Sequence, residues 1–264
     1  MDKAALMQLL DSRLVGRFLF YPRKQGPWQG PPGSQDHKMA MPDGTVVGGR
    51  FYLARPSGPH ILYFHGNGEI AADYDDIGPM YNARGMSLLA VDYRGYGKSG
   101  GEPSVSRMLS DARVVFTQVK EWLASQGRGH LWVMGRSLGS ASALEIADAF
   151  PGAFSGLVIE SGFAHTLPLL MILGLPVHEM DASQMDDGIS NLAKISRYTG
   201  PTLVIHAEHD HIISLAQGED LFEHAGAAKK SFYMVRGANH NDILLRDLKG
   251  YMDTLEDFVK NDEE

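Results

Sequence analysis

The sequence predicts an α/β protein built on a central, mostly parallel β-sheet. Apolar runs of strand length recur along the chain, and segments with a helical spacing of apolar residues separate them. Most of these runs are continuous rather than alternating, which is typical of strands covered by helices on both faces. The length of 264 residues fits one such domain, so we expect residues 1–264 to form a single unit.

The expected elements alternate along the chain. Strands are expected at 51–55, 60–65, 87–93, 130–135, 156–161, 202–207 and 231–236. Helices are expected at 71–84, 106–125, 137–149, 214–225 and 241–259, where apolar residues return every three or four positions. The stretch 23–36, rich in proline and glycine, is expected to cross the surface before the sheet begins.

One connection is much longer than a loop requires. Residues 163–200 lie between two expected strands and mix an apolar stretch, LPLLMILGLP, with a polar one, HEMDASQMDD. We expect a small helical cap over the carboxyl edge of the sheet; the alternative is one crossover helix with irregular flanks. In a cap, some of the apolar side chains would line an acyl pocket, and otherwise they serve ordinary packing.

Composition excludes several classes of protein. The apolar fraction of 44% and the charged fraction of 21% are ordinary for a globular protein, and no run approaches the roughly 18 apolar residues of a membrane helix. The net charge of −8 is spread along the chain, which argues against a nucleic-acid partner. Because the chain has no cysteine and its first residues lack a secretory signal pattern, we expect a cytoplasmic location. The oligomeric state is not predicted.

The sequence GRSLG at 135–139 indicates a sharp turn from a buried strand into a helix. Gly135 and Gly139 have no side chains, so the strand and the helix can approach each other closely around Ser137. A serine on such a turn is exposed at the carboxyl end of the sheet, where parallel α/β sheets bind ligands. Glycine and serine are also common in plain structural turns, so this motif needs independent partners.

Two further side chains follow later strands and complete a candidate catalytic triad. A serine hydroxyl becomes a good nucleophile when a base takes its proton, and a carboxylate orients that base. Asp210 follows the strand expected at 202–207, and His240 follows the strand expected at 231–236. The order Ser137, Asp210, His240 is the one expected when successive strand ends of an α/β-hydrolase sheet supply a triad.

The loop after the strand at 60–65 supplies a candidate donor for an oxyanion. The sequence HGNGE places Asn67 directly after this strand, next to small residues that let the backbone approach a substrate. We expect the backbone amides of Asn67 and Leu138 to donate to the carbonyl oxygen of the substrate.

Five motifs, in this order and spacing, resemble those of the α/β-hydrolase superfamily of serine hydrolases: HGNGE, VDYRGYGKSGG, GRSLGS, HAEHDHII and GANHND. The resemblance runs from about residue 51 to about residue 258 and is particularly to the cap-poor branch that acts on acyl esters and acyl thioesters. It implies an eight-stranded, mostly parallel sheet flanked by helices, with a small cap after the sixth strand. It also implies the nucleophile Ser137, the acid Asp210, the base His240, oxyanion amides at Asn67 and Leu138, and no cofactor or metal.

Two positions depart from the usual family pattern. Ala207 stands where many relatives have glycine, which is expected to affect local packing only. Arg136 places a positive charge beside the nucleophile, in a direction that the sequence does not fix. The family residues that match Asp92 and Arg94 are usually structural.

Several polar residues admit other interpretations. The cluster at 206–211 holds residue types that zinc prefers, namely His206, Glu208, His209, Asp210 and His211. Adjacent residues on a strand point to opposite sides, however, so we expect no metal. Glu160 is an alternative to Asp210 as the acid. His65 is interpreted as stabilising its loop rather than as a base, and Asp242 as a charge in the first turn of the last helix.

The sequence therefore predicts a serine hydrolase that cleaves small-molecule carboxylic esters or thioesters with an apolar acyl part, through an acyl-enzyme. A serine peptidase of the same fold is the nearest alternative. A binding protein that keeps the pocket without catalysis is another.

Overall fold

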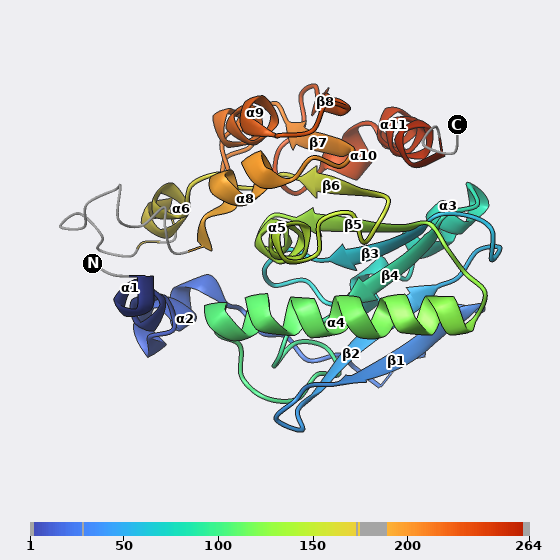
Figure 1. Cartoon of the computed structure of the whole chain (residues 1–264), viewed down its shortest axis with the longest axis horizontal. Helices are drawn as coiled ribbons and strands as arrows, with labels where there is room; N and C mark the ends of the chain where they lie inside the picture. The colour runs from blue at the N-terminus through green and yellow to red at the C-terminus, as the bar shows by residue number, and fades with distance from the viewer. Residues whose placement is uncertain (1–2, 28, 173, 175–188, 261–264) are drawn as a thin grey trace.

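The computed structural model describes residues 3–27, 29–172, 174 and 189–260, and contains an eight-stranded sheet between layers of helices (Figure 1). The strands are β1 (Ser34–Ala40), β2 (Val46–Tyr52), β3 (His60–Phe64), β4 (Ser87–Val91), β5 (Leu131–Arg136), β6 (Gly156–Glu160), β7 (Thr202–Ala207) and β8 (Lys230–Val235). They lie in the order β1-β2-β4-β3-β5-β6-β7-β8. β2 runs antiparallel to both of its neighbours, and every other pair is parallel. The predicted fold class is confirmed.

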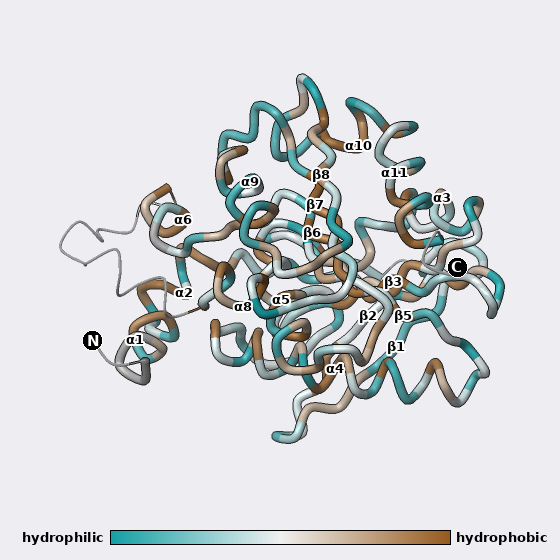
Figure 2. The backbone as a smooth tube through the Cα atoms, turned by 45° about the horizontal axis from the view of Figure 1, so that its top comes forward, coloured by the Kyte–Doolittle hydropathy of each residue, from teal (hydrophilic) through white to brown (hydrophobic). Residues whose placement is uncertain are grey.

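Helices cover both faces of the sheet. One face packs against α4 (Val105–Ser125), α5 (Gly139–Ala149), α8 (Asn191–Arg197) and α9 (Leu215–His224), and the other against η1 (Ala71–Tyr74), α3 (Gly78–Ala83), α10 (Ile243–Arg246) and α11 (Leu248–Lys260). Alternate side chains of β5 point to opposite faces of the sheet. Val133 packs in the core on the side of α4 and α5, whereas Trp132 and Met134 pack in the core on the side of α3 and α11. Figure 2 shows hydrophilic positions gathered on the outer loops and hydrophobic ones toward the strands.

Three helices lie on the side of the molecule where the parallel strands end (Figure 1). They are α1 (Lys3–Leu10), α2 (Arg13–Leu19) and α6 (Thr166–Ile172). α2 and α6 are neighbours there (Figure 1).

Among the described residues, no helix has both the length and the apolar character needed to cross a bilayer.

The structure corrects two expected features near the start of the sheet. The strand expected at 51–55 is instead β2, at Val46–Tyr52, and the expected surface crossing at 23–36 ends in β1, whose first residue is Ser34. Gly48 and Gly49 obscure the strand pattern of β2, and a Cβ on Gly49 would lie 2.8 Å from the carbonyl oxygen of Ala90 on β4. Pairing with β2 explains why the polar segment at 34–40 is a strand.

Two expected helices are each divided. The helix expected at 71–84 is η1 followed by α3, because Pro79 has no amide to continue the helical hydrogen bonds. The helix expected at 241–259 is α10 followed by α11, because the carboxylate of Asp247 accepts from the amide of Gly250 at 2.9 Å and begins a new helix.

The expected cap at 163–200 is described only in part. Residues 173 and 175–188 lie outside the described residues, so the cap as a unit stays a prediction. Of the two described helices, α8 packs on α5 and α9, and its Ile195 is fully buried. Leu169 of α6 lies at the carboxyl edge of the sheet, where it lines a pocket.

Gly139 is required where α5 passes the end of β3. A Cβ at this position would lie 2.0 Å from the carbonyl oxygen of Phe64. We expect Gly139→Ala to lower the free energy of unfolding by about 1–3 kcal/mol, because the backbone must shift to admit a methyl group. Gly16→Ala in α2 is the matched control, since an added Cβ there meets nothing within 4 Å and should be neutral or stabilising. Thermal unfolding of both variants checks this, and an unchanged melting temperature for Gly139→Ala would contradict it.

Candidate active site

Ser137 occupies a strained turn between β5 and α5. Its φ of +51° lies in the left-handed region, which costs a residue with a side chain on the order of 1–3 kcal/mol. The amide of Ser137 donates to the carbonyl of Glu160 at 2.8 Å and holds the turn in place. A Cβ on Gly135 would lie 2.3 Å from the carbonyl oxygen of Gly139. The end of β5 and the start of α5 therefore approach each other as closely as the two glycines predict.

The structure brings Ser137, His240 and Asp210 into one hydrogen-bonded chain. Nε2 of His240 lies 3.0 Å from Oγ of Ser137, and Nδ1 lies 2.7 Å from Oδ2 of Asp210. The three residues follow β5, β8 and β7, and all three are buried. In this arrangement the imidazole can take the proton of the hydroxyl, while the carboxylate orients the ring and stabilises its charged form.

The surroundings of Asp210 keep its carboxyl group ionised. Burial disfavours the charge, but the hydrogen bond from His240 and the amides of Ile213 and Ile212 hold the pKa of Asp210 below its usual value. The two amides donate to Oδ1 at 2.8 and 3.0 Å. Oδ2 then accepts from Nδ1 of His240, which leaves Nε2 free to accept the proton of Ser137.

The loop after β3 is fixed beside Ser137. The side-chain oxygen of Asn67 accepts from the amide of Tyr21 at 2.9 Å and from the hydroxyl of Tyr96 at 2.7 Å. In the part of the chain that the structure describes, the backbone amides of Asn67 and Leu138 donate to no other residue. Both are therefore available to a ligand.

A cavity of about 150 Å³ opens onto this group of residues. It is lined by Leu19, Gly66, Asn67, Glu69, Ser137, Leu138, Leu169, Ile212, His240 and Asn241. The side chains of Leu19, Leu138, Leu169 and Ile212 give it an apolar wall. Leu19 belongs to α2, a helix that the sequence does not assign to the site, because an apolar helix carries no chemical signal.

Comparisons with known proteins agree with this architecture. Residues 56–179 match the family model described as serine aminopeptidase, S33. The α/β hydrolase domain-containing protein 17B of Xenopus laevis is 28% identical over 227 residues, which cover 82% of this chain and 72% of that protein. An esterase of Pyrococcus furiosus superposes with a TM-score of 0.74 at 16% identity, covering 92% of this chain and 98% of the esterase. The chain has the α/β-hydrolase fold.

A second solved structure has the same fold. A soluble variant of monoglyceride lipase from Saccharomyces cerevisiae superposes with a TM-score of 0.68 at 14% identity, covering 89% of this chain and 97% of the lipase. The matched family segment contains Ser137 and Asn67 but ends before Asp210 and His240.

The remaining carboxylates near this site have other partners. Glu160, the alternative acid, accepts from Arg136 at 2.9 Å and from the hydroxyl of Tyr251 at 2.7 Å, whereas Asp210 contacts His240. Asp242 lies before α10 rather than in the first turn of the last helix. It accepts from the amide of Asn239 at 2.6 Å and so braces the loop that carries His240.

Histidines near the site also have structural partners. His65 is buried under the loop after β3, with Nδ1 2.8 Å from the carbonyl oxygen of Gly66. His206 is fully buried, its Nε2 lies 2.8 Å from the carbonyl oxygen of Ile213, and burial lowers its pKa. Within the described ranges, no three residues of the types that bind metals are grouped to hold an ion.

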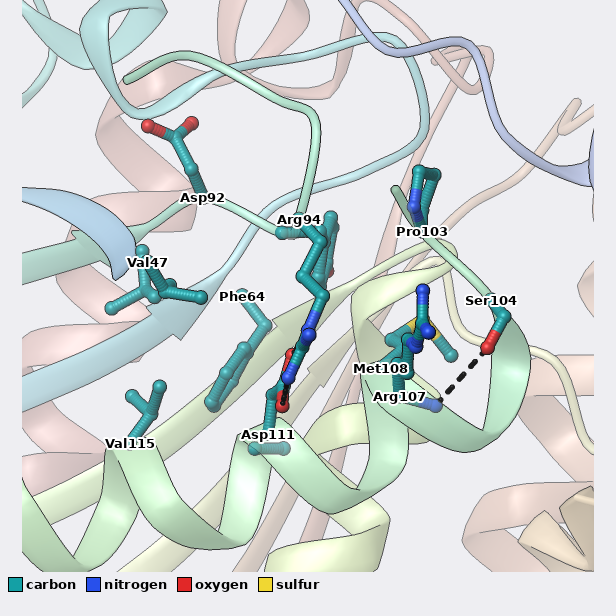
Figure 3. Close-up of a pocket in the computed structure, with 13 residues that line it drawn as sticks. Val47, Phe64, Asp92, Arg94, Pro103, Ser104, Arg107, Met108, Asp111 and Val115 are labelled. Atoms are coloured by element: carbon teal, nitrogen blue, oxygen red, sulfur yellow. Dashed lines mark hydrogen bonds and ion pairs between the residues drawn. The ribbon is translucent and has the colours of Figure 1, made fainter. Parts of the chain in front are cut away.

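Asp92 and Arg94 hold loops together away from the hydrogen-bonded chain. Arg94 forms a two-pronged ion pair with Asp111 of α4, at 2.6 and 2.9 Å (Figure 3). Asp92 accepts from the amide of Ala71 at 2.8 Å. The cavity shown in Figure 3 has a volume of only about 10 Å³, and its lining does not include Ser137.

Proposed function

We propose that this protein, which has the α/β-hydrolase fold, is a serine hydrolase that cleaves carboxylic esters or thioesters through an acyl-enzyme. The observation that carries the proposal is the unbroken chain from Oγ of Ser137 through the imidazole of His240 to Asp210, with separations of 3.0 and 2.7 Å. Distances of this size suit proton transfer between a nucleophile and its base.

The proposed reaction has two halves. Oγ of Ser137 attacks the acyl carbon while Nε2 of His240 takes the proton, and Asp210 stabilises the imidazolium. The amides of Asn67 and Leu138 donate to the oxyanion, and His240 then protonates the departing alcohol or thiol. A water molecule, activated by His240, releases the acid and restores the serine. No cofactor or metal takes part in these steps.

The described walls of the pocket favour a short apolar acyl group. Leu19, Leu169 and Ile212 line a cavity of about 150 Å³. An apolar cavity of about this volume can hold a molecule the size of benzene. We therefore expect acyl chains of roughly two to six carbons to be preferred over long ones.

A peptidase of the same fold is the second candidate, because the matched family model is described as a serine aminopeptidase. Such an enzyme needs a free carboxylate to hold the substrate's amino group. Among the described residues that line the pocket, the carboxylate is that of Glu69, and its two oxygens already accept from Arg136 at 2.9 Å and from the amide of Gly66 at 2.8 Å. This arrangement favours the ester or thioester over the peptide.

A substrate panel tests the proposal. We expect the purified protein to hydrolyse p-nitrophenyl acetate, butyrate and hexanoate and the matching thioesters at least about 100-fold faster than aminoacyl p-nitroanilides or the laurate ester. Amide turnover that exceeds ester turnover would support the peptidase. No turnover of any substrate by the folded protein would support a binding protein.

A further inference from the structure

We propose that Arg136 is a positioning residue, which fixes the loop of His240 and the loop of Asn67 relative to Ser137. The inference rests on the proposed function, because it assigns Arg136 a role in that reaction. Arg136 is the last residue of β5 and directly precedes Ser137. Any segment that its side chain binds is therefore held in a fixed position relative to the nucleophile.

The guanidinium of Arg136 is buried and donates in three directions. Nη2 donates to the backbone carbonyl of His240 at 2.8 Å. Nη1 donates to Glu160, at the end of β6, at 2.9 Å, and Nε donates to Glu69, in the loop after β3, at 2.9 Å. One side chain therefore joins the segments that supply the base and the oxyanion donor to the strand that supplies the nucleophile.

Glu69 extends this connection to the oxyanion loop. Its Oε2 accepts from the amide of Gly66 at 2.8 Å and from the hydroxyl of Tyr74 at 2.7 Å. Burial favours the neutral acid, but the charge of Arg136 lowers the pKa of Glu69 to about 2, so the carboxylate stays charged. Gly66 immediately precedes Asn67, and its position sets where the amide of Asn67 points.

The shape of arginine suits this role and the shape of lysine does not. A guanidinium presents five N–H groups in a rigid plane, whereas an ammonium donates from a single atom and does not reach acceptors spread around such a plane. Burying a charge costs free energy, and well-packed apolar residues often give equal or greater stability. The cluster is therefore better explained by the geometry that it fixes than by a gain in stability.

The first test compares two arginine-to-lysine variants. Arg136→Lys keeps the charge and loses the planar arrangement of donors. We expect kcat to fall about 100-fold, the loss typical of a small misplacement of reacting groups, and KM to change less than about threefold. Arg94→Lys is the matched control, since Arg94 is also buried and paired with carboxylates but contacts neither loop. It should lower the melting temperature and leave kcat within about threefold of wild type.

A second variant covers the case in which Arg136→Lys does not fold. Arg136→Met with Glu160→Gln removes one positive and one negative charge, so the net charge of the cluster is unchanged. We expect its kcat to be at least about 30-fold below that of Glu160→Gln alone.

The outcomes separate this inference from the proposed function. Wild-type kcat in the folded Arg136→Lys variant, or equal kcat in the double variant and Glu160→Gln, overturns the role of Arg136. An equal loss of kcat in Arg94→Lys also overturns it, because destabilisation alone would then explain the effect. Failure of the proposed function has a different signature: the wild-type protein itself shows no turnover that depends on Ser137.

Discussion

Replacing Ser137 with alanine is expected to lower kcat/KM for p-nitrophenyl butyrate by about 10⁴-fold or more, because no acyl-enzyme can form. The same variant should take no covalent label from a fluorophosphonate, a reagent that reacts with activated serines. Rates and labelling are measured together, so that a trace of contaminating esterase is not mistaken for residual activity.

Ser140→Ala is the matched control for this experiment. Ser140 lies one turn along the helix, and its hydroxyl donates to the carbonyl of Ser137 at 2.7 Å instead of facing His240. We expect this variant to keep its covalent label. Labelling of the Ser137→Ala protein would place the nucleophile at another residue.

Asp210→Asn is expected to lower kcat by about 10³- to 10⁴-fold with little change in KM. An amide at this position no longer selects the imidazole form whose Nε2 accepts the proton of Ser137, and it does not stabilise the imidazolium. The pKa of Asp210 is held low, so the wild-type carboxylate stays charged across the neutral range in which the assay is run. Steady-state kinetics at pH 7 to 8 give the comparison.

Glu160→Gln distinguishes the two candidate acids. Glu160 bonds to Arg136 and Tyr251. We expect a loss of kcat at least about tenfold smaller than that of Asp210→Asn. A larger loss in Glu160→Gln would make Glu160 the acid and would contradict the assignment of Asp210.

Much of the fold follows from local pattern. β3 to β7 are largely continuous apolar runs because both faces of each are covered, and such runs are visible in a single sequence. α4 has a clear apolar stripe and was expected within one residue of its observed bounds, Val105–Ser125. The contact of His240 with Ser137 follows from the same logic, since the carboxyl ends of parallel strands meet at one edge of the sheet.

Features that depend on tertiary partners were not predictable. β1 is polar, and only its pairing with β2 makes it a strand. The place of Leu19 in the pocket depends on how α2 docks, which its apolar pattern does not specify. The orientation of the Arg136 side chain is fixed by three acceptors that are far apart in the sequence. The sequence therefore indicates a charge beside the nucleophile but not the groups to which it donates.

Mass spectrometry of a rapidly quenched reaction tests the central claim most directly. Wild-type protein mixed with p-nitrophenyl butyrate and quenched in acid within the first turnover is digested, and the acylated peptide is sequenced. The account predicts a butyryl group on Ser137 that forms and decays at rates compatible with kcat. A butyryl group on another side chain, or turnover with no acylated peptide at any time, would contradict it.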